Sequence, residues 1–244
     1  MQITLDKGYQ FGLGVFETIA VEQNTPLLLS WHLERLRHSM EELGILQNVE
    51  ESYVLSWLSQ YPAEHHALKI MASDENLILT MRPNPYTPGQ LQTGFHLAYS
   101  GVYRNETSPL VRHKTLNYGD CILEKRRAGD LGADELIFCN SRGEICEGTT
   151  TNIFFASGGQ IYTPPVSSGL LPGILRRFIM ENYPVKEQVL MKEDALQMEE
   201  CFVTNSLMGV MPVNSLEKKT YSRGPAVQAC FERYHALAGS VSSC

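Results

Sequence analysis

Pairs of strand-like segments joined by short polar turns occur in both halves of the chain. Residues 15–21 alternate in hydrophobicity, and a polar turn leads to a second expected strand at Leu27–Leu29. Residues 67–82 repeat the pattern around the turn "SDEN", as do residues 135–164 and 200–213. Because turns this short place consecutive strands side by side, the pattern predicts antiparallel hairpins.

Segments of helical periodicity separate these hairpins. Residues 30–44 are expected to form a helix with Ser30 as its cap and Gly44 at its end. Further helices are expected over 119–131, 171–183, 192–198 and 225–239. Residues 143–156 are expected to form one continuous strand. Hairpins with helices between them predict an α+β protein of two lobes.

A polar connection containing Pro109 follows the strand expected at residues 94–103. Such a connection is typical of a domain boundary. The sequence therefore predicts a small N-terminal α/β domain over residues 1–107 and a larger C-terminal α/β domain over residues 108–244.

Composition excludes several classes of protein. Of the 244 residues, 43% are hydrophobic and 19% charged, so the chain can bury a core. A net charge of −7 excludes a general attraction for nucleic acid or anionic membranes. The six cysteines form no C-x-x-C pair, and no histidine stands at metal-ligand spacing from a cysteine pair, so no metal site is expected. The start lacks a signal peptide's apolar stretch, which predicts a cytoplasmic protein with reduced thiols.

Two charged residues stand in unusual settings. Lys114, in "RHKTLNYGD", is either a solvated ammonium or the amine that a carbonyl cofactor needs. Glu147, in "EICEGTTTNIF", is either a strand-end carboxylate facing water or the partner of a protonated ring nitrogen.

Three other features could hold a phosphate. "LPGILR", residues 171–176, places Pro172 and Gly173 at a helix start, where free N–H groups attract anions. Ser206, in "TNSLMG", follows a strand and could add a hydroxyl. Arg35 is either a solvated helix residue or a phosphate ligand. Together with Lys114 and Glu147, these features match the needs of pyridoxal 5′-phosphate.

Six segments, in order, resemble those of the class IV aminotransferase family, the fold type IV pyridoxal-phosphate enzymes. They are "DKGYQFGLGVFET", "HLERL", "HKTLNY", "EICEGTTTNIF", "LPGILR" and "NSLMGVMPV". The resemblance covers nearly the whole chain. It implies two α/β lobes with the cofactor between them, in a homodimer whose pockets borrow residues from the partner. One departure is Leu13, where the family commonly has aspartate.

The resemblance also implies roles for individual residues. Lys114 would bind the cofactor covalently and move protons, and Glu147 would pair with the pyridine nitrogen. The phosphate would be held by Arg35, the N–H groups of Ile174 and Leu175, and Ser206. Tyr118 and Asn152 would line the pocket, and Thr18 would assist proton transfer.

Three activities share this family, and the segments "HKTLNY" and "NSLMGVMPV" look most like those of 4-amino-4-deoxychorismate lyases. That resemblance implies conversion of 4-amino-4-deoxychorismate to 4-aminobenzoate and pyruvate in folate biosynthesis. The alternative is a D-amino-acid or branched-chain aminotransferase, although Arg82 is followed by no second arginine or histidine of the kind D-amino-acid enzymes use. A third possibility is a protein that binds the cofactor without turnover.

Overall fold

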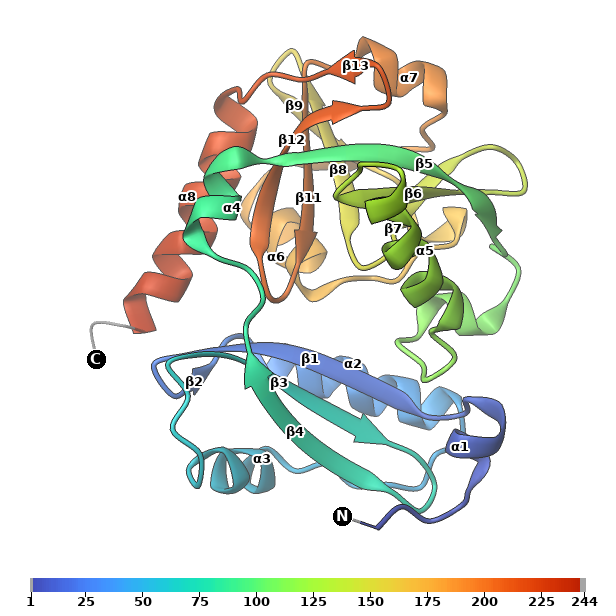
Figure 1. Ribbon diagram of the computed structural model, residues 1–244, viewed down its shortest axis with the longest axis vertical. Helices are drawn as coiled ribbons and strands as arrows, with labels where there is room; N and C mark the ends of the chain where they lie inside the picture. The colour runs from blue at the N-terminus through green and yellow to red at the C-terminus, as the bar shows by residue number, and fades with distance from the viewer. Residues whose placement is uncertain (1, 242–244) are drawn as a thin grey trace. The chain divides into compact units, whose positions relative to one another are not determined.

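Residues 2–241 are described by a computed structural model, in which the chain divides into two units (Figure 1). Unit 1 contains residues 2–85, 113–118 and 237–241, and unit 2 contains residues 86–112 and 119–236. The expected boundary at 107/108 lies inside unit 2. The reason is strand β5 (Phe95–Arg104), which pairs in parallel with two strands of unit 2 and so belongs to its sheet.

Unit 1 is built on a four-stranded antiparallel sheet of order β2-β1-β3-β4. Its strands are β1 (Val15–Glu22), β2 (Thr25–Pro26), β3 (His65–Ala72) and β4 (Leu77–Pro83). The hairpin at "SDEN" is confirmed. The expected strand at Leu27–Leu29 is wrong, because the backbone turns at Leu28 (φ +53°) and helix α2 (Leu29–Glu42) begins at once. Leu28 therefore occupies the cap position, and Ser30 lies inside the helix.

One face of this sheet carries the core of unit 1. Alternate residues of β1 (Val15, Ile19 and Val21) pack with Leu33 and Leu36 of α2 and with helix α3 (Glu51–Leu58). The side chains of β1 thus divide into a helix-facing set and an opposite set that includes Phe16 and Thr18.

The short helix α1 (Lys7–Phe11) is capped by Asp6, whose carboxylate accepts a hydrogen bond from the Tyr9 N–H.

Unit 2 contains a mixed nine-stranded sheet of order β10-β9-β8-β11-β12-β5-β6-β7, with β13 paired to β12. Its other strands are β6 (Glu135–Asn140), β7 (Ile145–Gly148), β8 (Asn152–Ser157), β9 (Gln160–Thr163), β10 (Val185–Glu187), β11 (Glu200–Asn205), β12 (Gly209–Leu216) and β13 (Lys219–Thr220). The expected continuous strand over 143–156 is wrong: β7 and β8 are separate strands on either side of Thr149–Thr151.

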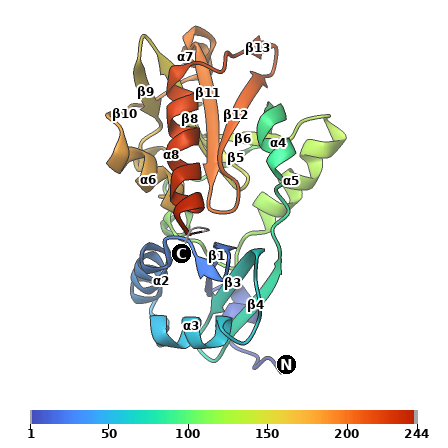
Figure 2. The same cartoon turned by 90° about the vertical axis from the view of Figure 1, so that its left-hand side faces the viewer.

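The helices of unit 2 are α4 (Pro88–Thr93), α5 (Gly119–Asp130), α6 (Ile174–Asn182), α7 (Lys192–Gln197) and α8 (Pro225–Val241, of which residues 237–241 fall in unit 1). Figure 2 shows α8 running along β11. The buried Glu200 carboxylate accepts the Val227 N–H at 2.9 Å and anchors the start of α8. Farther along, the Tyr234 ring lies against Gly209. Within residues 2–241, no helix combines the length and apolarity needed to cross a membrane.

Candidate active site

Lys114 is held at the start of β1 by backbone hydrogen bonds. The Phe16 N–H donates to the Lys114 carbonyl at 2.8 Å, and the Leu116 N–H donates to the Gly14 carbonyl at 2.8 Å. Gly14 is required here, because a Cβ at this position would meet the Leu116 side chain and the Ala72 carbonyl. The neighbouring His113 Nδ1 lies 3.0 Å from the hydroxyl of the buried Ser39 on α2. These contacts fix the lysine's backbone within unit 1.

The Lys114 side chain is half-buried and lies against two aromatic rings. Its Nζ is 4.5 Å from the centroid of Phe16 and 4.9 Å from that of Tyr118. The two rings meet edge to face at 5.2 Å. Thr18, two residues after Phe16 on the same strand, shares the Phe16 face of the sheet. Unit 1 therefore brings together Lys114, Tyr118 and Thr18, and Lys114 is not a fully solvated ammonium.

Arg35 reaches β1 from helix α2 and forms a bidentate ion pair with Glu17 there. Arg35 Nε donates to Glu17 Oε1 and Nη2 donates to Oε2, both at 2.7 Å. His32 Nδ1 lies 2.6 Å from the same Oε2. Glu17 and His32 are each 1% exposed, so this cluster is buried. Arg35 is thus an oriented residue and not a solvated one.

The ionisation of this cluster follows from its burial. Burial acts to raise the pKa of Glu17, but the charge of Arg35, the effect of His32 and their hydrogen bonds outweigh it and lower the pKa to about 2. Burial is also the main reason that the pKa of His32 falls below its usual value. A neutral His32 beside an ionised Glu17 must donate from Nδ1, which fixes its tautomer.

Glu147 lies at the centre of the second group of predicted residues, in unit 2. Glu147 is 5% exposed, which excludes the water-facing interpretation. Arg104 Nη2 donates to Glu147 Oε1 at 2.8 Å, and the Leu171 N–H donates to Oε2 at 3.1 Å. The Arg104 guanidinium also lies 4.4 Å from the Phe138 ring centroid. Arg104 therefore compensates and orients a buried carboxylate.

Asn152 holds the segment that leads into α6. Its Nδ2 donates to the Leu171 carbonyl at 2.9 Å, so Glu147 and Asn152 fix both backbone groups of Leu171. A Cβ at Gly173 would collide with the Asn152 side chain. Helix α6 begins at Ile174 with Gly173 as cap and no side-chain cap. The first-turn N–H groups of Ile174 and Leu175 are therefore suited to an anion.

Ser206 lies in the turn between β11 and β12, close in the sheet to Asn152, which pairs in register with Thr204. The Asn205 side chain shapes this turn by accepting the N–H groups of Leu207 and Met208, both at 2.9 Å. Thr204 Oγ1 is buried without a hydrogen-bond partner among residues 2–241. An orphaned hydroxyl and an uncapped helix start fit the oxyanion end of a phosphorylated cofactor.

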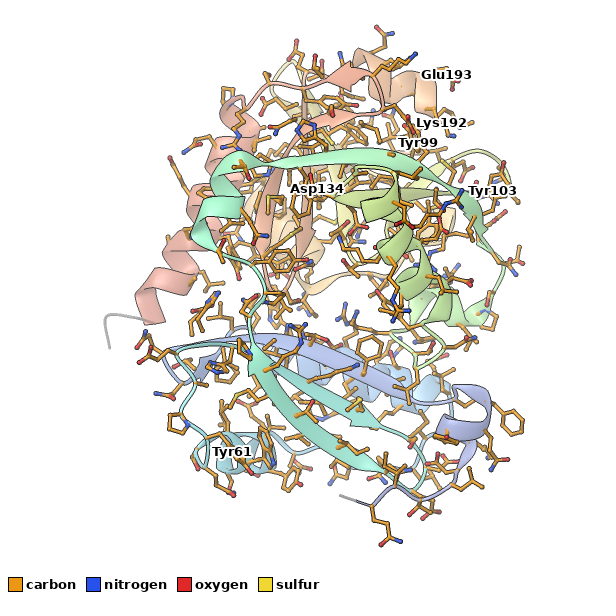
Figure 3. The ribbon with its side chains drawn as sticks, viewed as in Figure 1. Tyr61, Tyr99, Tyr103, Asp134, Lys192 and Glu193 are labelled. Atoms are coloured by element: carbon orange, nitrogen blue, oxygen red, sulfur yellow. The ribbon has the colours of Figure 1, made fainter. Side chains whose placement is uncertain are left out.

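A cavity of about 250 Å³ also opens in unit 2, but none of the predicted site residues lines it. Its wall includes Tyr99, Lys192 and Tyr221, and Figure 3 shows Lys192 beside Tyr99. The Lys192 Nζ lies 4.3 Å from the Tyr99 ring centroid. This cavity is separate from the two groups of residues described above.

Sequence reasoning missed Glu17 and His32. From the sequence, Arg104 is either a ligand of a substrate carboxylate or a solvated loop residue, so its role was left open. The signal for Glu17 is its position in "VFETI", where strand alternation places an acid on the same side as Val15 and Ile19. His32 precedes Arg35 by three residues and so shares its helix face. No local signal links Arg104 to Glu147, because the pair is 43 residues apart in the chain.

Comparison with known proteins agrees with the segments found in the sequence. The model of the family described as amino-transferase class IV matches residues 14–216. An aminodeoxychorismate lyase of Bacillus subtilis is 29% identical over 239 residues, covering 88% of this chain and 82% of the relative. A D-alanine aminotransferase of Bacillus licheniformis is 28% identical over 246 residues, covering 90% of this chain and 84% of the relative.

Among solved structures, the branched-chain aminotransferase of Thermoproteus uzoniensis with norvaline superposes with a TM-score of 0.87. The identity is 22%, and the match covers 98% of this chain and 90% of that chain. The likeness shows the fold, that of the fold type IV pyridoxal-phosphate enzymes, and confirms the expected α+β architecture.

Proposed function

Because the chain belongs to the class IV aminotransferase family, whose enzymes depend on pyridoxal phosphate, we propose that it is a lyase acting on 4-amino-4-deoxychorismate. The products are 4-aminobenzoate and pyruvate, on the route to folate. The observation that carries the proposal is the placement of the Lys114 amine over Phe16, on the sheet face that also carries the Thr18 hydroxyl. The similarity to the Bacillus subtilis lyase supports it.

The residues identified from the family resemblance would hold the cofactor. In unit 1, Lys114 would form the covalent bond and Arg35 would bind the phosphate. In unit 2, Glu147 would pair with the ring nitrogen, oriented by Arg104 and by the Leu171 N–H. The remaining residues would bind the phosphate or line the pocket: Ile174, Leu175, Ser206, Tyr118 and Asn152. When bound, the cofactor supplies a carbonyl for the substrate amine and a conjugated ring that accepts an electron pair.

The chain's own residues then perform the proton transfers. The Lys114 amine removes the proton from the carbon that bears the amino group. The bond to the neighbouring enolpyruvyl oxygen breaks, and the Thr18 hydroxyl assists proton delivery to the departing group. The ring becomes aromatic and the three-carbon fragment becomes pyruvate, so neither water nor a keto acid is consumed.

The enzyme is proposed to act as a homodimer. Light scattering of the purified protein tests this oligomeric state.

The visible absorption spectrum of the purified holoprotein tests the function. A band that neither D-alanine nor a branched-chain L-amino acid bleaches, with release of 4-aminobenzoate from aminodeoxychorismate, is the expected result. Bleaching by either amino acid, without 4-aminobenzoate, would instead make the chain an aminotransferase, the second candidate given its 28% identity to a D-alanine aminotransferase. A cofactor band without either activity would leave a cofactor-binding protein.

A further inference from the structure

Lys69 lies beside the proposed reaction site and has no role in the mechanism above. Its Nζ is 4.6 Å from the centroid of the Phe16 ring, the ring that also contacts the Lys114 amine at 4.5 Å. Lys69 on β3 is the register partner of Thr18 on β1. Directly opposite residues of an antiparallel pair project to the same face of the sheet. Phe16, Thr18, Lys69 and the Lys114 amine thus gather on one face of unit 1.

Lys69 brings a positive charge to this face of the sheet. Among residues 2–241, no carboxylate forms an ion pair with its ammonium, which lies against the Phe16 ring. Burial first, and then the charge of Arg82, lowers the pKa of Lys69 below its usual value. A half-buried ammonium beside another cation is unfavourable unless an anion binds there. The carboxylate in this part of β1, Glu17, projects to the opposite face and is bound by Arg35.

The proposed substrate supplies anions of the required kind. 4-Amino-4-deoxychorismate carries one carboxylate on its ring and a second on the enolpyruvyl group that departs. An amino acid with an apolar side chain carries only one. Thr18 lies directly opposite Lys69. If Thr18 acts on the departing group, as proposed above, the enolpyruvyl carboxylate would be the one nearest to this ammonium.

We propose that Lys69 binds the enolpyruvyl carboxylate of the substrate and so selects a dicarboxylate over a simple amino acid. The inference rests on the proposed function, since that substrate provides the second carboxylate. Lys69 is a binding residue here: it holds the leaving group near Thr18 while Lys114 moves the proton. Its ammonium can donate three hydrogen bonds, which suits a carboxylate on a flexible three-carbon group.

The test is the Lys69→Met variant, which removes the charge and keeps an unbranched stem. The KM for aminodeoxychorismate is expected to rise on the order of ten- to a hundredfold, with kcat changed far less, as expected for a lost charged hydrogen bond. Chorismate, which has both carboxylates but no amine, serves as a non-reacting probe. Its dissociation constant should rise in parallel, whereas that of 4-aminobenzoate, which lacks the enolpyruvyl group, should stay unchanged.

Three controls separate binding from other roles. Lys69→Arg retains the charge and should recover most of the chorismate affinity. Lys7→Met removes an exposed lysine of unit 1, whose Nζ lies 3.5 Å from Asp74 Oδ2. This variant should bind chorismate and 4-aminobenzoate with unchanged affinity. The affinity of each variant for pyridoxal phosphate should match that of the unchanged protein, which also shows that the variant is folded.

The outcomes distinguish the inference from the proposed function. If the unchanged protein does not release 4-aminobenzoate, both are overturned. If it does, and Lys69→Met binds chorismate as tightly as before, the function stands and the role of Lys69 is overturned. Equal loss of chorismate and 4-aminobenzoate affinity, or loss of cofactor affinity, would also overturn that role.

Discussion

The Glu17 carboxylate and the Arg35 guanidinium are joined by two parallel hydrogen bonds of 2.7 Å in the interior of unit 1. Two of the five N–H groups of Arg35 are directed at Glu17, so the plane of the guanidinium is set by a residue on another element. Arg35, which is proposed to bind the cofactor phosphate, is therefore oriented before the cofactor binds. This pre-organisation reduces the entropy lost on binding.

Replacing Glu17 by glutamine is expected to lower the free energy of unfolding by about 3 to 5 kcal/mol, because it leaves a buried guanidinium without its anion. Glu22→Gln is the matched control. Glu22 is on the same strand and pairs with His65 at 2.7 Å, but His65 is 47% exposed. Its loss should cost less than about 1 kcal/mol. Urea denaturation of both variants checks the contrast, and equal costs would contradict it.

Asp6 should make unit 1 sensitive to acid. Burial acts to raise the pKa of Asp6, but hydrogen bonds to its carboxylate outweigh this effect and lower the pKa to about 2. Two of these bonds are donated by the Ser73 hydroxyl at 2.6 Å and by the Glu75 N–H at 3.0 Å. A carboxyl whose pKa is lower in the folded state stabilises the fold above its unfolded pKa of 3.8 and loses that effect as the pH falls toward 2. The stability difference between the unchanged protein and Asp6→Asn should therefore shrink from pH 4 to pH 2. A difference constant over this range would refute the prediction.

Lys114→Ala is expected to abolish turnover, since no other group is assigned to remove the substrate proton. Release of 4-aminobenzoate measures it. Lys218→Ala, at an exposed position of unit 2, is the control and should keep full activity. Appreciable activity in the Lys114 variant would show that the base is another residue.

Arg104→Gln should lower turnover on the order of tenfold or more, because Glu147 loses the charged hydrogen bond that orients it. The affinity for pyridoxal phosphate, followed by its absorption, should weaken as well. Arg127→Gln provides the comparison: Arg127 pairs with Glu124 at 3.5 Å but is 54% exposed, so its removal should change neither quantity. Similar behaviour of the two variants would argue against a positioning role for Arg104.

Gly209→Ala should be more destabilising than Gly132→Ala. Both glycines have nearly equal positive φ angles, +72° and +69°, so the backbone strain of an added Cβ is matched. At Gly209 the Cβ would also collide with the Tyr234 ring, whereas nothing lies within 4 Å at Gly132. We expect Gly132→Ala to cost about 1 kcal/mol and Gly209→Ala at least twice that. Thermal unfolding of the pair measures the difference.

The elements that sequence reasoning placed well are those whose pattern is local. The hairpin around "SDEN" and the helix at residues 119–131 follow from periodicity and turn residues, and both are present. The break between β7 and β8 depends instead on a distant partner. The buried Glu135 carboxylate accepts hydrogen bonds from Thr149 and Thr150, which lets the chain bend there. No pattern within residues 143–156 contains that information.

The candidate site shows the same division. The resemblance of short segments pointed to Lys114, Arg35 and Glu147, and each has a defined environment. The residues that orient them, Glu17 and Arg104, were missed or left open because their roles arise only when separate elements pack together. The signal available in the sequence was a charged residue at an otherwise apolar strand position. The prediction used this signal for Glu147 but not for Glu17.

Residues 113–118 belong to unit 1 although residues 86–112 precede them in unit 2. During synthesis, a nascent chain of 85 residues therefore still lacks the segment that carries Lys114. Recombination between relatives faces the same constraint. A crossover placed at residue 85 would join one parent's strand β1 to the other parent's lysine segment, and the hydrogen bonds between Phe16, Gly14 and residues 114–116 would have to form between sequences that did not evolve together.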